Sequence, residues 1–239
     1  MPEPLILHIE TATDICSVAI SEGDQQLALV ESGPERSHAS LLNPFIRKAL
    51  KECGRDFPSL GAVCVSKGPG SYTGLRIGVS TAKGIAYALD IPLLAIGTLD
   101  NMAYGAMQHP TLREPLVKQE NIILLCPMLD ARRMEVYSCF YTSDLVVTRE
   151  VSADIITETS YHQELEAHPV YFFGNGAVKC SEVITHPNAH FIPGIEPSAA
   201  QMILPGLDRF MNRQFEDVAY FEPYYLKDFI ATIPKKKVL

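Results

Sequence analysis

The first thirty residues show the hydrophobic pattern of short strands. Residues 5–9 form an apolar run, residues 16–21 alternate between apolar and polar positions, and a second alternating run covers residues 25–32. A Glu-Gly-Asp turn signal at residues 22–24 separates the last two runs. The pattern therefore predicts an antiparallel meander at the start of the chain.

The next seventy residues alternate between helical and strand patterns. Apolar residues recur at helical spacing between Ser37 and Gly54, where glycine supplies a stop signal. The buried-strand pattern of residues 60–70 leads into a glycine-rich turn, a helix from about Tyr72 to Leu89 and a short strand at 91–98. This order of elements predicts an α/β layer of the ribonuclease-H-like kind.

The pattern changes after residue 98, where a polar, proline-containing connection leads into two apolar strands around an Asp-Ala-Arg-Arg turn. Later predicted elements are a helix near residues 153–165, a strand at 170–174, and helices near 177–185 and 198–211. We therefore divide the chain into an N-terminal ribonuclease-H-like lobe, residues 1–98, and a C-terminal α/β lobe, residues 99–239, with a basic C-terminal tail.

Composition and charge indicate a folded protein that does not bind nucleic acid over its whole surface. The 239 residues are 47% hydrophobic, which is enough for a substantial core. The formal net charge is −8 and the sequence pI is about 5.4, so the molecule as a whole repels RNA. RNA contact would then be local, for example at the Lys235–Lys237 tail, or would occur through a partner.

The cysteines and the longest apolar runs indicate the cellular compartment. None of the six cysteines forms a Cys-x-x-Cys pair, and most lie in apolar runs, as expected for buried thiols in a reducing cytosol. No apolar run approaches the roughly 20 residues that span a bilayer, and no signal segment begins the chain. We expect a cytoplasmic protein with no membrane partner.

The stretch SKGPGSYTGLRIGVSTAKG, residues 66–84, is rich in glycine but matches no standard active-site motif. A P-loop needs Gly-Lys-Ser/Thr, and Gly74 is followed by leucine. A dinucleotide fingerprint needs its third glycine one residue earlier, and a nucleophile elbow needs one residue between glycine and serine. Glycines before a helix nevertheless expose backbone N–H groups, so an anion site remains an alternative to a simple tight turn.

A row of small residues follows the helix in this stretch. Its members recur every four residues and carry nothing larger than a methyl group: Gly70, Gly74, Gly78, Ala82 and Ala86. Each glycine inside a helix costs roughly 0.5–1 kcal/mol relative to alanine, so the row indicates close approach of another backbone. That backbone belongs either to this chain or to a second polypeptide, and both alternatives stay open.

The segment HIETATD, residues 8–14, stands where sugar kinases, actin and heat-shock ATPases keep a phosphate-contacting loop of Asp-x-Gly-Thr type. Glu10 replaces the aspartate and Ala12 replaces the glycine, so a methyl group hinders the approach of a phosphate. The loop is therefore impaired as a phosphate site. The residues of a possible nucleotide or anion site are Glu10, Thr11, Gly68, Gly70 and Ser71.

No metal or catalytic set emerges from the remaining polar residues. Among the histidines only His186 and His190 are four apart, and a proline lies between them. His38 opens the first helix and is expected to cap it or to lie on the surface. In the turn LDARRMEVY, residues 129–137, an arginine is placed either to hold a carboxylate or phosphate or to stabilise the turn.

Several motifs together resemble the TsaB (YeaZ) family of tRNA threonylcarbamoyladenosine biosynthesis proteins. They are LHIETATDICSVAI, GPGSYTGLRIG followed by AKGIAYAL, DARRMEVY, FGNGA and EPYYL, in order from residue 7 to about 226. The resemblance departs at Glu10, where the family usually has aspartate, and residues 143–168 match no family motif. It implies two ribonuclease-H-like lobes of the actin-like ATPase superfamily.

The resemblance also implies a role. A TsaB protein pairs with its paralogue TsaD, which carries the metal and nucleotide and transfers a threonylcarbamoyl group to the adenosine beside the anticodon of tRNAs that read codons beginning with A. An ATPase, TsaE, joins this pair, and TsaB lacks the paired histidines of TsaD. The sequence agrees, because His38 is followed four residues later by leucine. We expect a non-catalytic partner with no cofactor or metal of its own, contacting tRNA indirectly and forming a homodimer when alone.

The family's dimer surface is built from the first two helices, which correspond here to about Ser37–Cys53 and Tyr72–Leu89. The predicted interface residues are Leu41, Leu42, Phe45, Tyr72, Gly74, Leu75, Arg76, Gly78 and Ala82. The main alternative is an ATPase or phosphotransferase that acts alone through the loop residues above. A peptidase is a weaker alternative, because no metal set or paired nucleophile and base stands at recognisable spacing.

Overall fold

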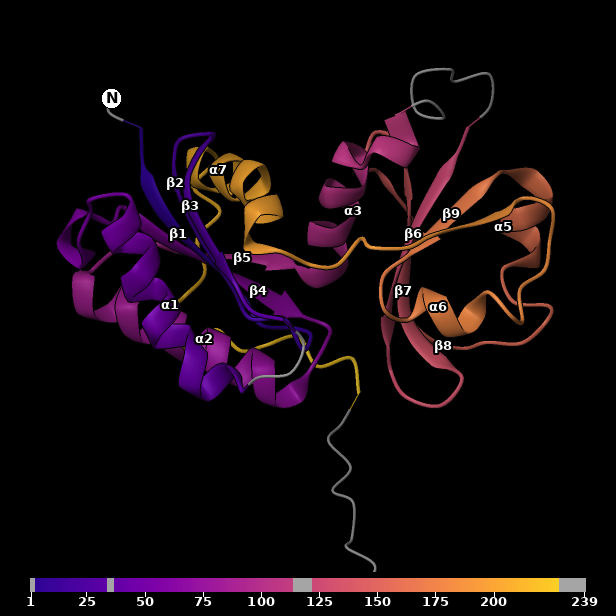
Figure 1. Ribbon diagram of the computed structural model, residues 1–239, viewed down its shortest axis with the longest axis horizontal. Coiled ribbons are helices and arrows are strands. Elements are labelled where there is room, and N and C mark those ends of the chain that lie inside the picture. The colour runs from indigo at the N-terminus through magenta and orange to yellow at the C-terminus, as the bar shows by residue number, and fades with distance from the viewer. Residues whose placement is uncertain (1–2, 34–36, 114–121, 228–239) are drawn as a thin grey trace, which may run out of the picture.

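The computed structural model describes residues 3–33, 37–113 and 122–227, which form two lobes joined by a helix (Figure 1). The first lobe contains β1 (Leu5–Glu10), β2 (Ser17–Glu22), β3 (Gln25–Glu31), α1 (His38–Glu52), the 3-10 turn η1 (Phe57–Ser59), β4 (Ala62–Gly68), α2 (Tyr72–Leu89) and β5 (Leu93–Gly97). The helix α3 (Thr98–Gln108) follows and lies between the lobes. The predicted basic tail, Lys235–Lys237, lies outside the described residues.

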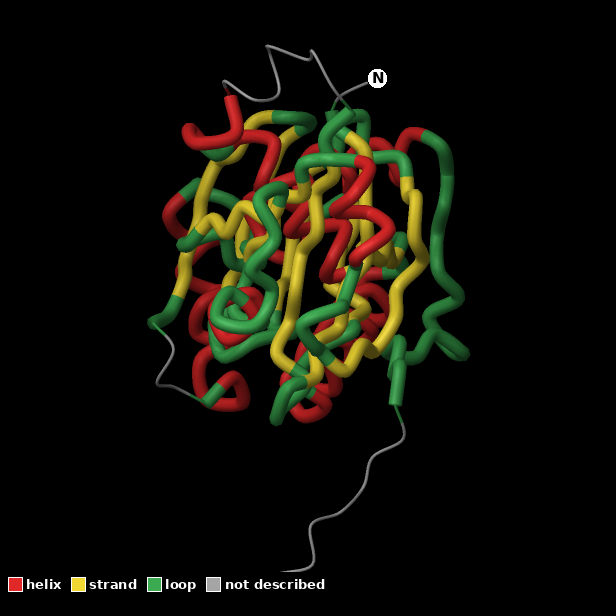
Figure 2. Tube along the Cα trace, turned by 90° about the vertical axis from the view of Figure 1, so that its right-hand side faces the viewer, coloured by secondary structure: helices red, strands yellow, loops and turns green. Residues whose placement is uncertain are grey.

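The second lobe repeats the arrangement of the first. It contains β6 (Leu124–Asp130), β7 (Glu135–Thr142), β8 (Val147–Ile155), α5 (His162–Ala167), β9 (Val170–Phe173), α6 (Ala177–Cys180) and β10 (Ala189–Ile192). The sheet orders are β3-β2-β1-β4-β5 and β10-β9-β6-β7-β8, and in each sheet an antiparallel meander adjoins two parallel strands. Seen from the side of the second lobe, its strands stand side by side (Figure 2). The predicted α/β class with two ribonuclease-H-like lobes is confirmed.

The C-terminal part of the chain returns to the first lobe. After β10 the chain crosses back and forms η2 (Ala199–Met202) and α7 (Ile203–Met211) against the first sheet (Figure 1). Met202 and Phe210 pack on a cluster that includes Ile6 and Ile96 of that sheet. The predicted division at residues 98 and 99 therefore needs a correction, because residues 199–211 belong to the first lobe.

Alternation along β1 explains the two faces of the first sheet. Leu7 and Ile9 face α1 and α2 in one core cluster, whereas Ile6 joins the cluster under α7. His8 shares that second face, lies beside Gly206 of α7 and donates or accepts a hydrogen bond with Ser21 at 2.9 Å. Burial lowers the pKa of His8 to about 3, so the side chain is neutral at physiological pH.

The apolar face of α3 packs against the second sheet. Its residues Leu99, Met102 and Ala106 share a cluster with Leu125 and Leu129 of β6. The other face of the second sheet packs against α5 and α6 in a separate cluster. Within the described ranges, no helix has the length and apolar composition needed to cross a bilayer.

The small-residue row of α2 is buried inside its own lobe. A Cβ atom at Gly74 would collide with the carbonyl oxygen of Thr11, and one at Gly78 would collide with Thr11 Oγ1. Ala82 and Ala86 are also buried, at 0% and 1% exposure. The close backbone that the row predicted is therefore the chain's own loop after β1, and the alternative of a second polypeptide along this row is wrong.

The helix α2 offers two glycines with opposite surroundings, which gives a direct test of this packing. Gly74→Ala places a methyl group against the Thr11 backbone and is expected to cost about 1–3 kcal/mol of unfolding free energy. Gly84→Ala has no heavy atom within 4 Å of the new methyl group and is expected to gain about 0.5–1 kcal/mol from helix propensity. Urea unfolding measures both. Equal effects of the two substitutions would contradict close packing at Gly74.

Candidate functional site

A cleft of about 580 Å³ opens between the two lobes. The first lobe lines it with the loop after β1, including Asp14, and with the turn at residues 69–73 before α2. The second lobe contributes the turn between β6 and β7, including Arg132, and Asn175 after β9. A segment near the C-terminus, residues 224–227, completes the lining. The glycine-rich turn and the Asp-Ala-Arg-Arg turn, far apart in sequence, thus face the same cleft.

Glu10 lies beneath this cleft and does not reach it. The side chain is fully buried, Oε1 accepts a hydrogen bond from the Ala12 N–H at 2.7 Å, and Oε2 accepts one from Asn101 Nδ2 at 2.7 Å. Burial raises the pKa of the Glu10 carboxyl, and hydrogen bonds from Ala12, Asn101 and Ser66 oppose that rise. The prediction that Glu10 contacts a nucleotide or anion is therefore wrong for this arrangement, because both oxygens are used internally.

The other predicted anion-binding groups are also engaged within the chain. Thr11 is buried, and its hydroxyl donates to the carbonyl oxygen of Gly74 at 2.8 Å. The Ser71 N–H donates to the carbonyl oxygen of Ala12 at 2.6 Å, and Ser71 Oγ accepts from the Gly74 N–H at 3.2 Å. A Cβ atom at Gly70 would collide with the same Ala12 carbonyl.

Of the five predicted nucleotide or anion residues, only Gly70 and Ser71 line the cleft. Gly68 is buried next to the backbone of Tyr224, and Glu10 and Thr11 are fully buried. Two of the N–H groups at the start of α2 are satisfied by this chain, so the turn presents fewer donors than an open helix N-terminus.

Across the cleft, the turn between β6 and β7 is held by a lysine that sequence reasoning missed. Lys179 of α6 pairs with Asp130 and donates to the carbonyl oxygens of Arg133 and Glu135, at 2.6 and 2.7 Å. Asn175 Oδ1 accepts from the Asp130 N–H at 2.9 Å, which links the FGNGA motif to this turn. The ion pair between Asp130 and Lys179 therefore stabilises this turn.

The segment after α7 lies against α2 and contacts it through hydrogen bonds and an aromatic pair. Lys83 donates to the carbonyl oxygens of Ala219 and Phe221, at 3.2 and 2.7 Å. The Tyr225 ring lies 4.9 Å from that of Tyr72, and its hydroxyl accepts from Arg76 Nε at 3.3 Å. The EPYYL motif marks this segment in the sequence, but its place beside α2 was not predicted.

The predicted interface residues divide into exposed and buried groups. Leu41 and Phe45 of α1 and Tyr72 of α2 are half-buried, and Arg76 is exposed, so these four reach the surface of the adjacent helices α1 and α2 (Figure 1). The others are buried in the lobe: Leu42, Gly74, Leu75, Gly78 and Ala82. We correct the prediction for these five, because the chain's own sheet and loop cover these positions.

His38 also differs from expectation, because it is neither a helix cap nor a surface residue. It is 9% exposed, and its Nε2 lies 2.7 Å from the carbonyl oxygen of Thr13. His38 therefore fixes the start of α1 to the loop after β1 and borders Gly74.

Neither metal ligands nor reactive thiols gather at the cleft. In residues 3–33, 37–113 and 122–227, no group of three or more histidine, cysteine, aspartate or glutamate side chains is placed to hold a metal ion. Burial raises the pKa of the thiols of Cys16, Cys139 and Cys180 to about 11, and it also raises the pKa of Cys64 and Cys126. The buried cysteines are thus protonated thiols at neutral pH.

Comparison with known proteins extends these observations. Residues 32–235 match the family model of TsaD, the tRNA N6-adenosine threonylcarbamoyltransferase. The chain is 33% identical to the tRNA threonylcarbamoyladenosine biosynthesis protein TsaB of Escherichia coli over 58% of its own length and 55% of that protein's. It is 32% identical to TsaB of Bacillus subtilis over 57% of its own length and 54% of that protein's. The matched part thus spans about half the length of these curated relatives.

Solved structures agree with the sequence relatives in fold. YeaZ from Pseudomonas aeruginosa superposes with a TM-score of 0.72 at 22% identity, covering 93% of this chain and all of that one. A P. aeruginosa protein described as similar to peptidase YEAZ gives a TM-score of 0.76 at 23% identity, covering 94% of this chain and all of that one. This chain therefore shares the fold of these two structures. The family match covers most of the chain, and its sequence relatives and structural neighbours carry the TsaB and YeaZ names. The chain therefore belongs to the TsaD family, and it is similar to TsaB and YeaZ proteins.

Proposed function

We propose that this protein is a non-catalytic partner and activator of a TsaD-type threonylcarbamoyltransferase in the formation of threonylcarbamoyladenosine next to the tRNA anticodon. The sequence relatives are named for this biosynthesis, and the matching family model describes the transferase. In this role the partner carries nucleotide and metal, and this chain supplies a binding surface. A TsaE-type ATPase joins the assembled pair.

The observation that carries the proposal is the closure of the loop after β1 against α2. Sugar kinases, actin and heat-shock ATPases keep a phosphate-contacting loop at this place in the sequence. Here the acidic residue, Glu10, is fully buried, and both of its carboxylate oxygens accept hydrogen bonds within the chain. Contact with a phosphate or its metal ion would require these bonds to break. This closure favours a structural role for the first lobe over nucleotide chemistry.

The surface formed by Leu41, Phe45, Tyr72 and Arg76, here called the α1–α2 surface, is the proposed contact with the partner. The half-buried aromatic side chains beside an exposed arginine are residue types enriched at interface centres, and Leu41 adds apolar area. The Arg76 guanidinium lies 4.3 Å from the centre of the Tyr72 ring, which orders the arginine before binding. When no partner is present, the same surface would pair two copies of this chain.

The charge of the chain supports an indirect contact with tRNA. A formal net charge of −8 disfavours association with a polyanion, so the partner supplies most of the attraction to tRNA.

The alternative of an ATPase acting alone would need Glu10 to be exposed. A metal-dependent peptidase would need a metal set, and in the part of the chain that the structure describes no group of three or more histidine, cysteine, aspartate or glutamate side chains is placed to hold a metal ion.

Charge placed on the α1–α2 surface is expected to weaken the complex. Phe45→Asp buries a carboxylate at an apolar contact and should raise the Kd for the cognate TsaD-type protein about 30-fold or more, as for a hot-spot residue worth about 2 kcal/mol. Arg76→Glu tests the same surface without touching the core, because Arg76 is exposed. Titration calorimetry with the purified partner measures both variants.

The matched control is Val178→Asp, which adds the same charge to an apolar residue that is 71% exposed on α6 of the second lobe. It should leave the Kd within about twofold of the unmodified protein. If folded Phe45→Asp and Arg76→Glu variants bind as tightly as this control, the α1–α2 surface is not the contact.

The isolated chain is expected to bind ATP with magnesium weakly or not at all. Because Glu10, Thr11 and the Ser71 N–H are engaged internally, titration up to about 1 mM nucleotide should give no saturable heat and no phosphate release. The TsaD-type partner, titrated in the same buffer, serves as the positive control. Micromolar binding with turnover by this chain alone would favour the enzyme alternative.

A further inference from the structure

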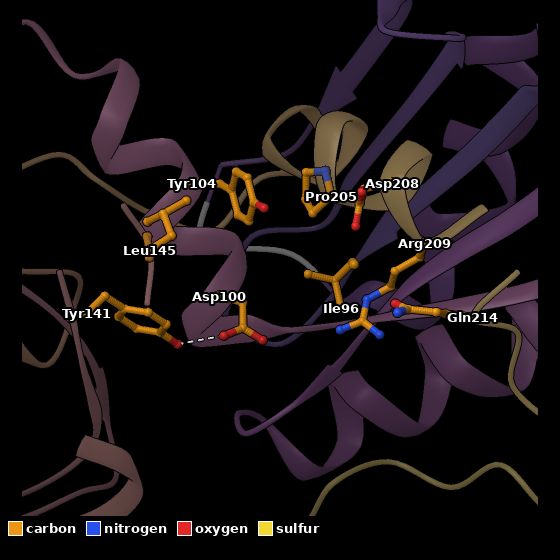
Figure 3. Close-up of a pocket in the computed structure, with 10 residues that line it drawn as sticks. Ile96, Asp100, Tyr104, Tyr141, Leu145, Pro205, Asp208, Arg209 and Gln214 are labelled. Carbon is orange, nitrogen blue, oxygen red and sulfur yellow. Dashed lines mark hydrogen bonds between the residues drawn. The ribbon is translucent and has the colours of Figure 1, made fainter. Parts of the chain in front are cut away.

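A second, smaller pocket shares no lining residue with the cleft. Its volume is about 230 Å³, and its walls come from β5, α3, α7 and the β7–β8 turn (Figure 3). Pockets that hold drug-sized ligands usually measure about 300–1,000 Å³, so this one suits a smaller molecule. The apolar part of the wall is formed by Ile96, Leu145 and the ring of Tyr104.

Three charged side chains line this pocket: Asp100 of α3, and Asp208 and Arg209 of α7. Asp208 Oδ1 accepts a hydrogen bond from Asn212 Nδ2 at 3.0 Å. Figure 3 shows the carboxylate of Asp100, from α3, and the guanidinium of Arg209, from α7, directed toward the same space. Among the described residues, Arg209 forms no ion pair, and Asp100 Oδ1 accepts a hydrogen bond from the buried Tyr141 hydroxyl at 2.7 Å. The two charges are therefore held on separate elements without neutralising each other.

The Tyr141 contact fixes the carboxylate in place. Tyr141 is 2% exposed, and burial raises the pKa of its hydroxyl, so the group stays a hydrogen-bond donor. With Oδ1 occupied in this way, Asp100 has its second oxygen available for a ligand. The Gln214 amide lies beside the Arg209 guanidinium in Figure 3, at the opposite end of the pocket.

We propose that this pocket binds a small zwitterion of the α-amino-acid class. The ligand's carboxylate accepts paired hydrogen bonds from the planar guanidinium of Arg209, and its ammonium group donates to Asp100. A short side chain lies against the apolar wall formed by Ile96 and Leu145. One molecule of this kind satisfies the charges of Asp100 and Arg209 at once, which neither a simple anion nor a simple amine does.

The ligand would also connect two parts of the fold. Asp100 belongs to the helix between the lobes, and Arg209 belongs to the C-terminal helix that packs on the first sheet. A bound amino acid would thus stabilise the folded chain by mass action, with a rise in melting temperature that depends on ligand concentration.

Matched ligands test the proposal on the unmodified full chain. L-alanine and L-valine, titrated to about 20 mM, should give saturable changes in melting temperature and in the ¹H–¹⁵N spectrum. Propionate lacks the ammonium group and ethylamine lacks the carboxylate, so each should bind at least about tenfold more weakly than L-alanine. No saturable effect of either amino acid, or equal binding of propionate or ethylamine, would overturn the proposal.

Matched variants locate the effect. Asp100→Asn keeps an oxygen for the Tyr141 hydroxyl but removes the charge, and Arg209→Gln removes the guanidinium; both should lower the affinity for L-alanine at least about tenfold. Arg47→Gln, at an exposed position of α1, is the control and should leave it unchanged. If folded Asp100→Asn and Arg209→Gln proteins bind L-alanine as the control does, the ligand lies elsewhere and the assignment is wrong.

Discussion

The close fit of α2 against the loop after β1 is the constraint on which the first lobe depends. Gly74 and Gly78 leave no side chain between the helix and Thr11, so the Thr11 hydroxyl reaches the helix backbone directly. His38 bonds the next part of the same loop and brings the start of α1 to it. One short loop therefore sets the positions of both helices that cover this face of the sheet.

The same loop also connects the two lobes. Glu10, the last residue of β1 before this loop, accepts a hydrogen bond from Asn101 on α3, and α3 packs against the second sheet. A buried carboxylate is costly unless its oxygens are satisfied, and here the Ala12 N–H and the Asn101 amide satisfy them. The Glu10 carboxylate thereby links β1 to α3 by hydrogen bonds instead of contacting a phosphate. This structural role of Glu10 underlies the proposal of a protein that binds a partner rather than a nucleotide.

The first lobe was largely predictable from its sequence, because its strands and helices carry strong periodic patterns. The helix predicted from Tyr72 to Leu89 has those bounds, and the strand meander is present. In the second lobe, the helix expected at residues 153–165 is wrong. The strand β8 runs to Ile155, and α5 begins only at His162. Much of β8 is only half-buried or exposed, so it lacks the apolar alternation that marks a strand.

The site was less predictable than the fold, for physical reasons. The four-residue spacing of small side chains correctly indicated a close backbone, but spacing carries no information on which chain supplies it. The engagement of Glu10 depends on Asn101, which is 91 positions away and lies in no recognisable motif. The pairing of Tyr225 with Tyr72 and Arg76 likewise depends on the return of the chain after α7. Such contacts follow from topology rather than from local sequence.

Backbone hydrogen exchange of this chain, measured alone and in the presence of the cognate TsaD-type protein, tests the central claim most directly. If the first lobe is the partner-binding element, amides of α1 and of the first turns of α2 will exchange more slowly in the complex, and those of β8 and α5 will not change. Slower exchange confined to β8 and α5, with α1 and α2 unaffected, would contradict the account.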